Sequence, residues 1–137
     1  MKLLIDANIL LDVLQDRAPH VRDSSLVWKL CESDRAEGWV TALTLANLVY
    51  VMRRELTPER IEDVLGRLSM IFHVTDLTAA DLSQTAGYQW NDFEDALQCV
   101  AAERVRADAI VTRNVRDYKD SRVPAYTPAE LLARVSY

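Results

Sequence analysis

The amino-acid sequence predicts a three-layer α/β/α sandwich whose central sheet is mostly parallel. Short apolar segments alternate along the chain with longer segments of helical periodicity, as expected for strands joined by helical crossovers. Half of the 137 residues are hydrophobic, with only three glycines and four prolines. We find no linker, internal repeat or low-complexity segment, so a single domain over residues 1–137 is expected.

The expected strands are short, apolar and rich in β-branched side chains. In chain order they cover residues 3–6, 39–42, 71–74 and 108–112, with a short edge strand over residues 123–126. Helical segments separate most of them, and a strand that returns through a helical crossover pairs in parallel with its neighbour. The sheet should therefore be covered by helices on both faces.

The expected helices show apolar residues at three- and four-residue spacing and carry capping residues at their starts. Thr57 followed by Pro58 marks one helix start. Thr127 followed by Glu130 forms a capping box. In chain order the helices cover residues 8–16, 22–35, 44–54 and 57–68, a segment beginning at residue 78, a long segment from residue 91 or 92 to 106, and a last segment beginning at residue 127.

Composition and charge exclude several classes of protein. No apolar stretch reaches the roughly 20 residues of a membrane span, and polar residues interrupt the start too soon for a signal peptide, so a soluble cytoplasmic protein is expected. The net charge of −5 argues against nucleic-acid binding through a general basic surface. Cys31 and Cys99 lie in apolar helical patterns without metal-binding spacing, so both should be reduced and buried.

Several acidic residues stand where strands end or helices begin. Asp6 closes the first strand, and Asp117 follows the fourth. Asp92 and Asp95 lie at the start of the long helix, with Asp95 bordering its apolar face. Ligands of open α/β sheets bind beyond the carboxyl ends of the strands, so these acids converge if the first and fourth strands are neighbours. Mg²⁺ and Mn²⁺ require such oxygen ligands, which predicts a metal-dependent phosphodiester hydrolase.

Each acid also has a purely structural interpretation. Asp6 and Asp92 are suitable caps for the helices that follow them. Glu94 favours the positive end of the long helix, and Asp117 is a loop acid. Asp12 is interpreted as a solvated residue on a helix surface. Convergence of several acids on one site is what favours chemistry over capping.

Four segments, occurring in order over nearly the whole chain, resemble the PIN domain family. They are residues 3–12, residues 41–47, residues 95–101 and residues 110–118. The likeness is closest to the small single-domain bacterial group that includes VapC-like toxins. The resemblance implies an α/β/α ribonuclease that uses Mg²⁺ or Mn²⁺, forms homodimers and is neutralised by an antitoxin protein.

The resemblance also assigns roles to individual residues. Asp6 matches the first acid of the family and Asp95 the third. Asn8 matches the polar residue that supports the first acid, and Thr112 matches the hydroxyl that lines the site after the last strand. These matches place carboxylates, an amide and a hydroxyl around one predicted metal.

Two positions depart from the family pattern. Asn47 stands where the second acid is usually a glutamate, and Asn114 replaces the fourth acid, with Asp117 as a possible substitute. Thr44 and Asn47 are spaced like a helix cap and its third residue, so a capping role for Asn47 stays open. An amide brings no charge and cannot act as a base, so weaker metal binding, with a preference for Mn²⁺, is expected.

The candidate site is defined by these residues together. The candidate metal ligands are Asp6, Asp95, Asp92 and Asp117. The candidate catalytic residues are Asp6, Asp95, Asp117 and Asn47, supported by Asn8, Thr112 and Asn114. The candidate phosphate-binding residues are Arg113 and Arg116, with Arg53, Arg54 and Lys119 as further residues of the rim. Trp90, just before the acidic helix, is a candidate for stacking on a base.

Two other functions remain open from the sequence. A catalytically weak PIN-like module that binds a protein or RNA is favoured by Asn47 and Asn114. A receiver-like domain that accepts a phosphoryl group also gathers acids at strand ends, but the fourth strand here leads to no lysine placed to contact that group. The order of the acids along the chain fits the nuclease pattern better.

Overall fold

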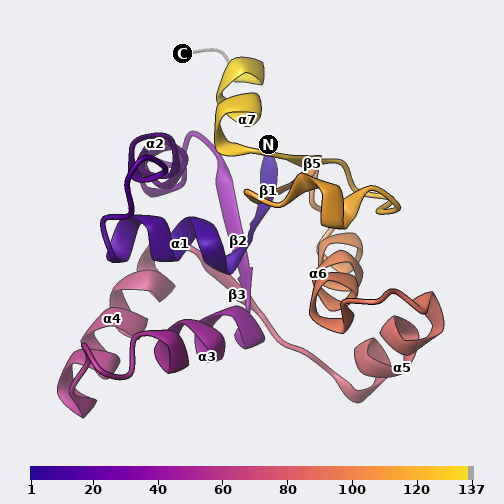
Figure 1. The fold of residues 1–137 in the computed structure, drawn as a ribbon, viewed down its shortest axis with the longest axis horizontal. Helices are drawn as coiled ribbons and strands as arrows, with labels where there is room; N and C mark the ends of the chain where they lie inside the picture. The colour runs from indigo at the N-terminus through magenta and orange to yellow at the C-terminus, as the bar shows by residue number, and fades with distance from the viewer. Residues whose placement is uncertain (136–137) are drawn as a thin grey trace.

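The computed structural model describes residues 1–135, which form the predicted mostly parallel sheet with helices on both faces (Figure 1). The sheet has five parallel strands in the order β3-β2-β1-β4-β5. The strands are β1 (Lys2–Ile5), β2 (Glu37–Thr41), β3 (His73–Thr75), β4 (Ala109–Val111) and β5 (Ala125–Tyr126). The first strand is therefore central, and it pairs directly with β4, as the convergence of acids required.

Seven α-helices and one 3-10 helix are present within residues 1–135. They are α1 (Ala7–Leu14), α2 (Val21–Glu32), α3 (Ala42–Val51), α4 (Pro58–Ile71), α5 (Ala79–Tyr88), α6 (Phe93–Arg104), the 3-10 helix η1 (Val115–Tyr118) and α7 (Pro128–Arg134). Figure 1 shows α1 to α4 and α7 on one side of the sheet and α5 and α6 on the other. The three layers of the predicted sandwich are thus formed.

Side chains of β1 alternate between two buried cores, one on each face of the sheet. Leu3 and Ile5 pack in the core beneath α1 and α2, whereas Leu4 packs in the core beneath α6. The paired strand β4 alternates in the same way, with Ile110 on the side of α6. All of these side chains are fully or almost fully buried, so the two central strands have no exposed face and are held rigidly.

The third strand begins two residues later than predicted. Ile71 ends α4 and Phe72 is its C-cap, so the strand starts at His73. Short apolar runs fit the buried side of a helix as well as a strand, and here Ile71 stays in the helix while Phe72 ends it and packs against Trp28 in the core. The prediction of a strand at residues 71–74 was therefore wrong for Ile71 and Phe72 and correct for the two residues that follow.

The second strand and the helix after it also shift. The strand covers Glu37–Thr41, and α3 begins at Ala42 because Thr41 caps it, its hydroxyl accepting a hydrogen bond from the Thr44 amide at 3.0 Å. The long helix is capped by Asp92, as predicted, but ends at Arg104. Arg106 follows with a φ of 59°, a left-handed conformation that ends the helix.

Both cysteines are free and buried, as predicted. Burial raises the pKa of Cys31 to about 12 and that of Cys99 to about 11, so both thiols stay protonated at neutral pH. No helix in residues 1–135 combines the length and apolar character that crossing a membrane requires.

Candidate active site

Asp6 stands at the junction between the central strand and the first helix. The Asp6 amide donates to the Val111 carbonyl at 3.0 Å, which ties the end of β1 to the end of β4. Its carboxylate caps α1, because Oδ1 accepts from the Ala7 amide at 2.8 Å. The capping interpretation is therefore correct, but it uses only one of the two carboxylate oxygens.

The second oxygen of Asp6 faces the residues that follow β4. Thr112 donates its hydroxyl to Asp6 Oδ2 at 2.8 Å, and the Asn8 amide nitrogen lies 3.4 Å from the same oxygen. Asn8 Oδ1 accepts from the Arg113 amide at 3.3 Å, and Thr112 Oγ1 accepts from the Asn114 amide at 3.1 Å. Asn8 and Thr112 thus contact both the Asp6 carboxylate and the loop beyond β4.

Asp95 reaches the same place from the first turn of α6. The Tyr118 hydroxyl lies 3.2 Å from Asp95 Oδ1 and 3.4 Å from Asp6 Oδ2, so it bridges the two carboxylates. Tyr118 is 3% exposed, and burial raises the pKa of its phenol, so the hydroxyl keeps its proton at neutral pH. One proton serves two acceptors here, and the pair of carboxylates is left short of positive partners.

The shortage of positive partners is reflected in the acidity of Asp95. Burial and then the charge of Asp92 raise its pKa to about 7, with further contributions from Asp6 and Asp117. The hydrogen bond from Tyr118 acts in the opposite direction and lowers the pKa. In the protein without a cation, Asp95 is therefore protonated in a substantial fraction of molecules at neutral pH.

Replacing Asp95 with asparagine should stabilise the cation-free protein only at high pH. The folded pKa of Asp95 lies above its unfolded value, so its contribution to stability is complete below about pH 4 and lost as the pH rises through 7. Because Asp95 is only partly buried, solvent screening limits the loss to about 1 kcal/mol, or roughly 3 °C in Tm. Melting curves of the two proteins in chelator should nearly coincide at pH 4, and at pH 8 Asp95→Asn should melt higher. An equal difference at both pH values would contradict the assignment.

Gln98 is a site residue that the sequence analysis missed. Its Nε2 donates to Thr44 Oγ1 at 3.0 Å and lies 3.5 Å from Asp6 Oδ1. The side chain is only 7% exposed, and its buried Oε1 has no hydrogen-bond partner among the described residues. The available signal was its spacing: three residues after Asp95, it shares the same face of α6.

Asn47 does not cap α3, because Thr41 occupies the cap and Asn47 lies within the helix. Its amide nitrogen is 3.4 Å from Glu94 Oε2, on the first turn of α6. The capping interpretation of Asn47 was therefore wrong. A carboxylate from α6, that of Glu94, instead lies beside the position where the sequence lacks an acid.

The four candidate metal ligands do not form one compact cluster. Asp6 and Asp95 share Tyr118, whereas Asp92 and Asp117 are exposed and line a cavity beside Asp95. Within residues 1–135, no group of three or more His, Cys, Asp or Glu side chains is arranged to hold a metal ion. Mg²⁺ in phosphate-processing sites is typically bound by one or two carboxylates together with water and substrate phosphate, which the Asp6 and Asp95 pair fits.

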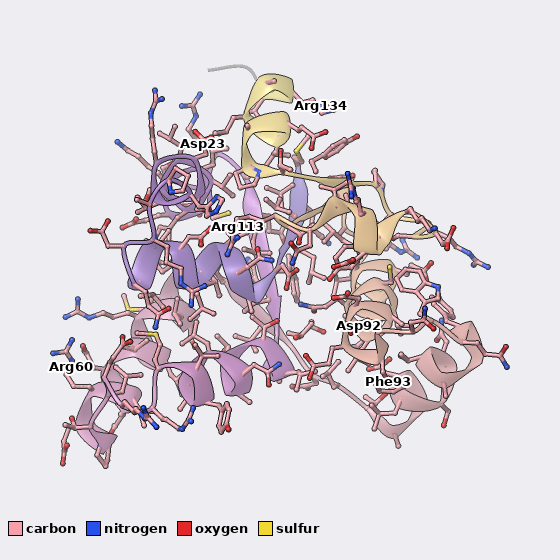
Figure 2. All side chains as sticks on the ribbon, in the orientation of Figure 1. Asp23, Arg60, Asp92, Phe93, Arg113 and Arg134 are labelled. Carbon is pink, nitrogen blue, oxygen red and sulfur yellow. The ribbon has the colours of Figure 1, made fainter. Side chains whose placement is uncertain are left out.

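Asp12 is not a solvated helix-surface residue, as the sequence had suggested. It is fully buried, and its Oδ2 accepts from Arg113 Nε at 3.0 Å and from the Ser24 hydroxyl at 2.9 Å. Figure 2 shows Arg113 beside α1, where this ion pair forms. Arg113 therefore has a structural partner in Asp12, and its contact with phosphate stays a prediction. Arg116 remains exposed, next to the cavity at Asp95.

The sequence matches a known protein family. The family model of the PIN domain matches residues 2–116. No curated protein sequence matches the chain.

Solved structures of bacterial proteins share the fold at low sequence identity. FitAcB from Neisseria gonorrhoeae has a TM-score of 0.68 and 16% identity, over 93% of this chain and 98% of that one. A toxin-antitoxin complex from Klebsiella pneumoniae has a TM-score of 0.70 and 17% identity, over 92% and 97%. VapC20 from Mycobacterium tuberculosis, described as a sarcin-ricin loop cleaving toxin, has a TM-score of 0.64 and 12% identity, over 79% and 86%.

Proposed function

This chain belongs to the PIN domain family, and we propose on that basis that it is a metal-dependent ribonuclease that hydrolyses RNA phosphodiester bonds. The observation that carries the proposal is the pairing of Asp6 and Asp95 through Tyr118. These carboxylates come from elements 89 residues apart in the sequence, yet they meet beyond the carboxyl ends of the strands, where ligands of α/β sheets bind.

Asp6 and Asp95 are the residues that would hold a divalent cation. When bound, Mg²⁺ or Mn²⁺ supplies positive charge that stabilises the phosphate in the transition state and favours deprotonation of the attacking water. Thr112 and Asn8 fix the direction of the Asp6 carboxylate, and Tyr118 sets its separation from Asp95. The candidate roles of Asp117, Asp92, Asn47 and Asn114 are to complete the shell through water or to orient the substrate.

We further propose that the protein is the toxin of a toxin-antitoxin pair, neutralised by a separate protein and active as a homodimer. The fold similarity supports this proposal, because the related structures include VapBC2 from Rickettsia felis bound to a promoter DNA fragment and FitAB bound to DNA. The similarity covers 98% and 94% of those two chains.

The test is cleavage of single-stranded RNA by the purified protein in Mn²⁺, in Mg²⁺ and in chelator. We expect cleavage in Mn²⁺ and no cleavage in chelator. Cleavage in Mg²⁺ should be slower, because Mg²⁺ gives up its bound water reluctantly and the site has few charged ligands to replace that water. Restoring Mn²⁺ after chelation should restore the activity. Intact RNA in Mn²⁺, or equal cleavage with and without chelator, would contradict the proposal.

A binding module without turnover is the second candidate function. It is favoured by Asn47 in place of an acid and by the lack of a three-acid metal group in residues 1–135. Calorimetric titration with Mn²⁺ and with RNA separates the two functions. A module would bind RNA with the same affinity whether or not the metal is present and would never cleave it.

A further inference from the structure

A cavity of about 490 Å³ is lined by Asp95 and by residues that take no part in the two-carboxylate pairing described above. Its walls come from the connection between α5 and α6, from the start of α6 and from η1 with the residues after it. Figure 2 shows Asp92 at the start of α6, at the edge of this region. The volume lies within the range of sites that bind small molecules or single groups of a larger ligand.

One wall of the cavity is aromatic. Trp90 lies with its ring centroid 6.5 Å from Tyr118, in an edge-on arrangement at 72°, and 6.0 Å from Tyr88. Packing between these rings fixes the indole while leaving it partly exposed. Since Tyr118 is the residue that joins Asp6 and Asp95, the aromatic wall leads directly to the two carboxylates.

The cavity lining also carries two cations, Arg116 and Lys119, among four acids, Asp92, Asp95, Asp117 and Asp120. Arg116 and Lys119 are exposed, and neither side chain makes a hydrogen bond or ion pair with any residue in the described part of the chain. Unpaired cations are notable in a protein with a net charge of −5, because acidic partners are abundant. They are available to an anionic ligand, and a guanidinium is well suited to contact phosphate oxygens.

We propose that this cavity is a nucleotide subsite, in which an unpaired RNA base stacks on Trp90 and an adjoining phosphate contacts Arg116 and Lys119. The inference rests on the proposed function, since it takes RNA as the ligand. A base within a duplex is already stacked and paired, whereas a base in a loop or single strand offers a free face to an aromatic side chain. The subsite therefore selects unpaired RNA next to the bond that is cut.

The first test measures binding of a fluorescein-labelled single-stranded RNA by anisotropy, in Ca²⁺, with the integrity of the RNA checked on a gel. Stacking on an aromatic residue contributes enough that Trp90→Leu should weaken binding about tenfold or more. Trp90→Phe retains a ring and should stay within about threefold of the wild type. Circular dichroism and thermal melting check that both variants fold.

The second test uses tryptophan fluorescence and paired RNA. Single-stranded RNA should quench the wild-type emission, and most of this quenching should disappear in Trp90→Phe although that variant still binds. Trp28 and Trp39 lie elsewhere, against Phe72 and His73, so they serve as internal controls. Duplex RNA of the same sequence should cause little quenching. Equal quenching by duplex and single strand would overturn the proposal.

The third test concerns the phosphate contacts. Arg116→Ala should weaken binding and reduce the slope of log affinity against log salt by about 0.7, the value for one lost contact to a single strand. Arg60→Ala removes the same charge from the far side of the molecule, on α4, and should change neither quantity much (Figure 2). Equal effects of the two substitutions would overturn the phosphate assignment.

The outcomes separate this subsite from the proposed function. Binding that depends on Trp90, together with no cleavage in Mn²⁺, would support the subsite and reject the ribonuclease. Cleavage and binding that are unchanged in Trp90→Leu would reject the subsite and retain the ribonuclease.

Discussion

Replacing Asp6 with asparagine is expected to lower Mn²⁺-dependent RNA cleavage by about 1000-fold while leaving the protein folded. This factor corresponds to about 4 kcal/mol of lost transition-state stabilisation, which is in keeping with removal of a charged metal ligand. Asparagine remains a good helix cap, so α1 should keep its start. The measurement is the initial rate of cleavage at saturating Mn²⁺.

A matched control is available on α4. Asp63 is exposed and pairs only with Arg67, one turn along the same helix, so Asp63→Asn removes an equal charge from the surface. Its cleavage rate and its Tm should stay close to those of the wild type. If Asp6→Asn retained more than about a tenth of the activity under these conditions, Asp6 would not be a metal ligand.

Replacing Asp12 with alanine is expected to cause a large loss of stability, because Asp12 is fully buried and ion-paired. The substitution leaves Arg113 facing a buried space and removes the acceptor of the Ser24 hydroxyl. Breaking a buried ion pair in this way costs about 3 kcal/mol, and for a chain of this size the Tm should fall by roughly 10 °C. Thermal melting at pH 7 measures the effect.

A double-mutant cycle with Arg113→Ala tests the cause. If the loss comes from the unpaired charge, the double variant should be less destabilised than the sum of the two single variants. Additive losses would mean that Asp12 and Arg113 act independently, despite their 3.0 Å contact. Because the Arg113 amide also bonds Asn8, the same variants should lower cleavage through displacement of the loop after β4.

The supporting residues around Asp6 were predictable because their placement follows from short segments and one pairing. Once β1 and β4 are neighbours, Asp6 and Thr112 must end at the same edge of the sheet. Asp95 followed from its position bordering the apolar face of its helix. Because β1 and β4 are parallel neighbours, residues predicted from separate local patterns lie together at one site.

Other features depended on tertiary contacts that no local pattern reveals. Tyr118 reaches the carboxylates because η1 turns the chain back toward α6, and nothing in its sequence indicates a 3-10 helix. Asp12 was placed at the surface because its partner, Arg113, lies 101 residues away. The boundary at Ile71 was misplaced because apolar residues suit a helix and a strand equally.

The separation of Asp6 from Tyr118 along the chain has a consequence for synthesis on the ribosome. The two residues are 112 positions apart, so the site is incomplete until Tyr118 has been added. At about 5–20 residues per second, Asp6 waits roughly 6 to 22 seconds for Tyr118 to be added. The proposed ribonuclease activity therefore cannot reach the messenger or ribosome that is producing the protein before Tyr118 has been added.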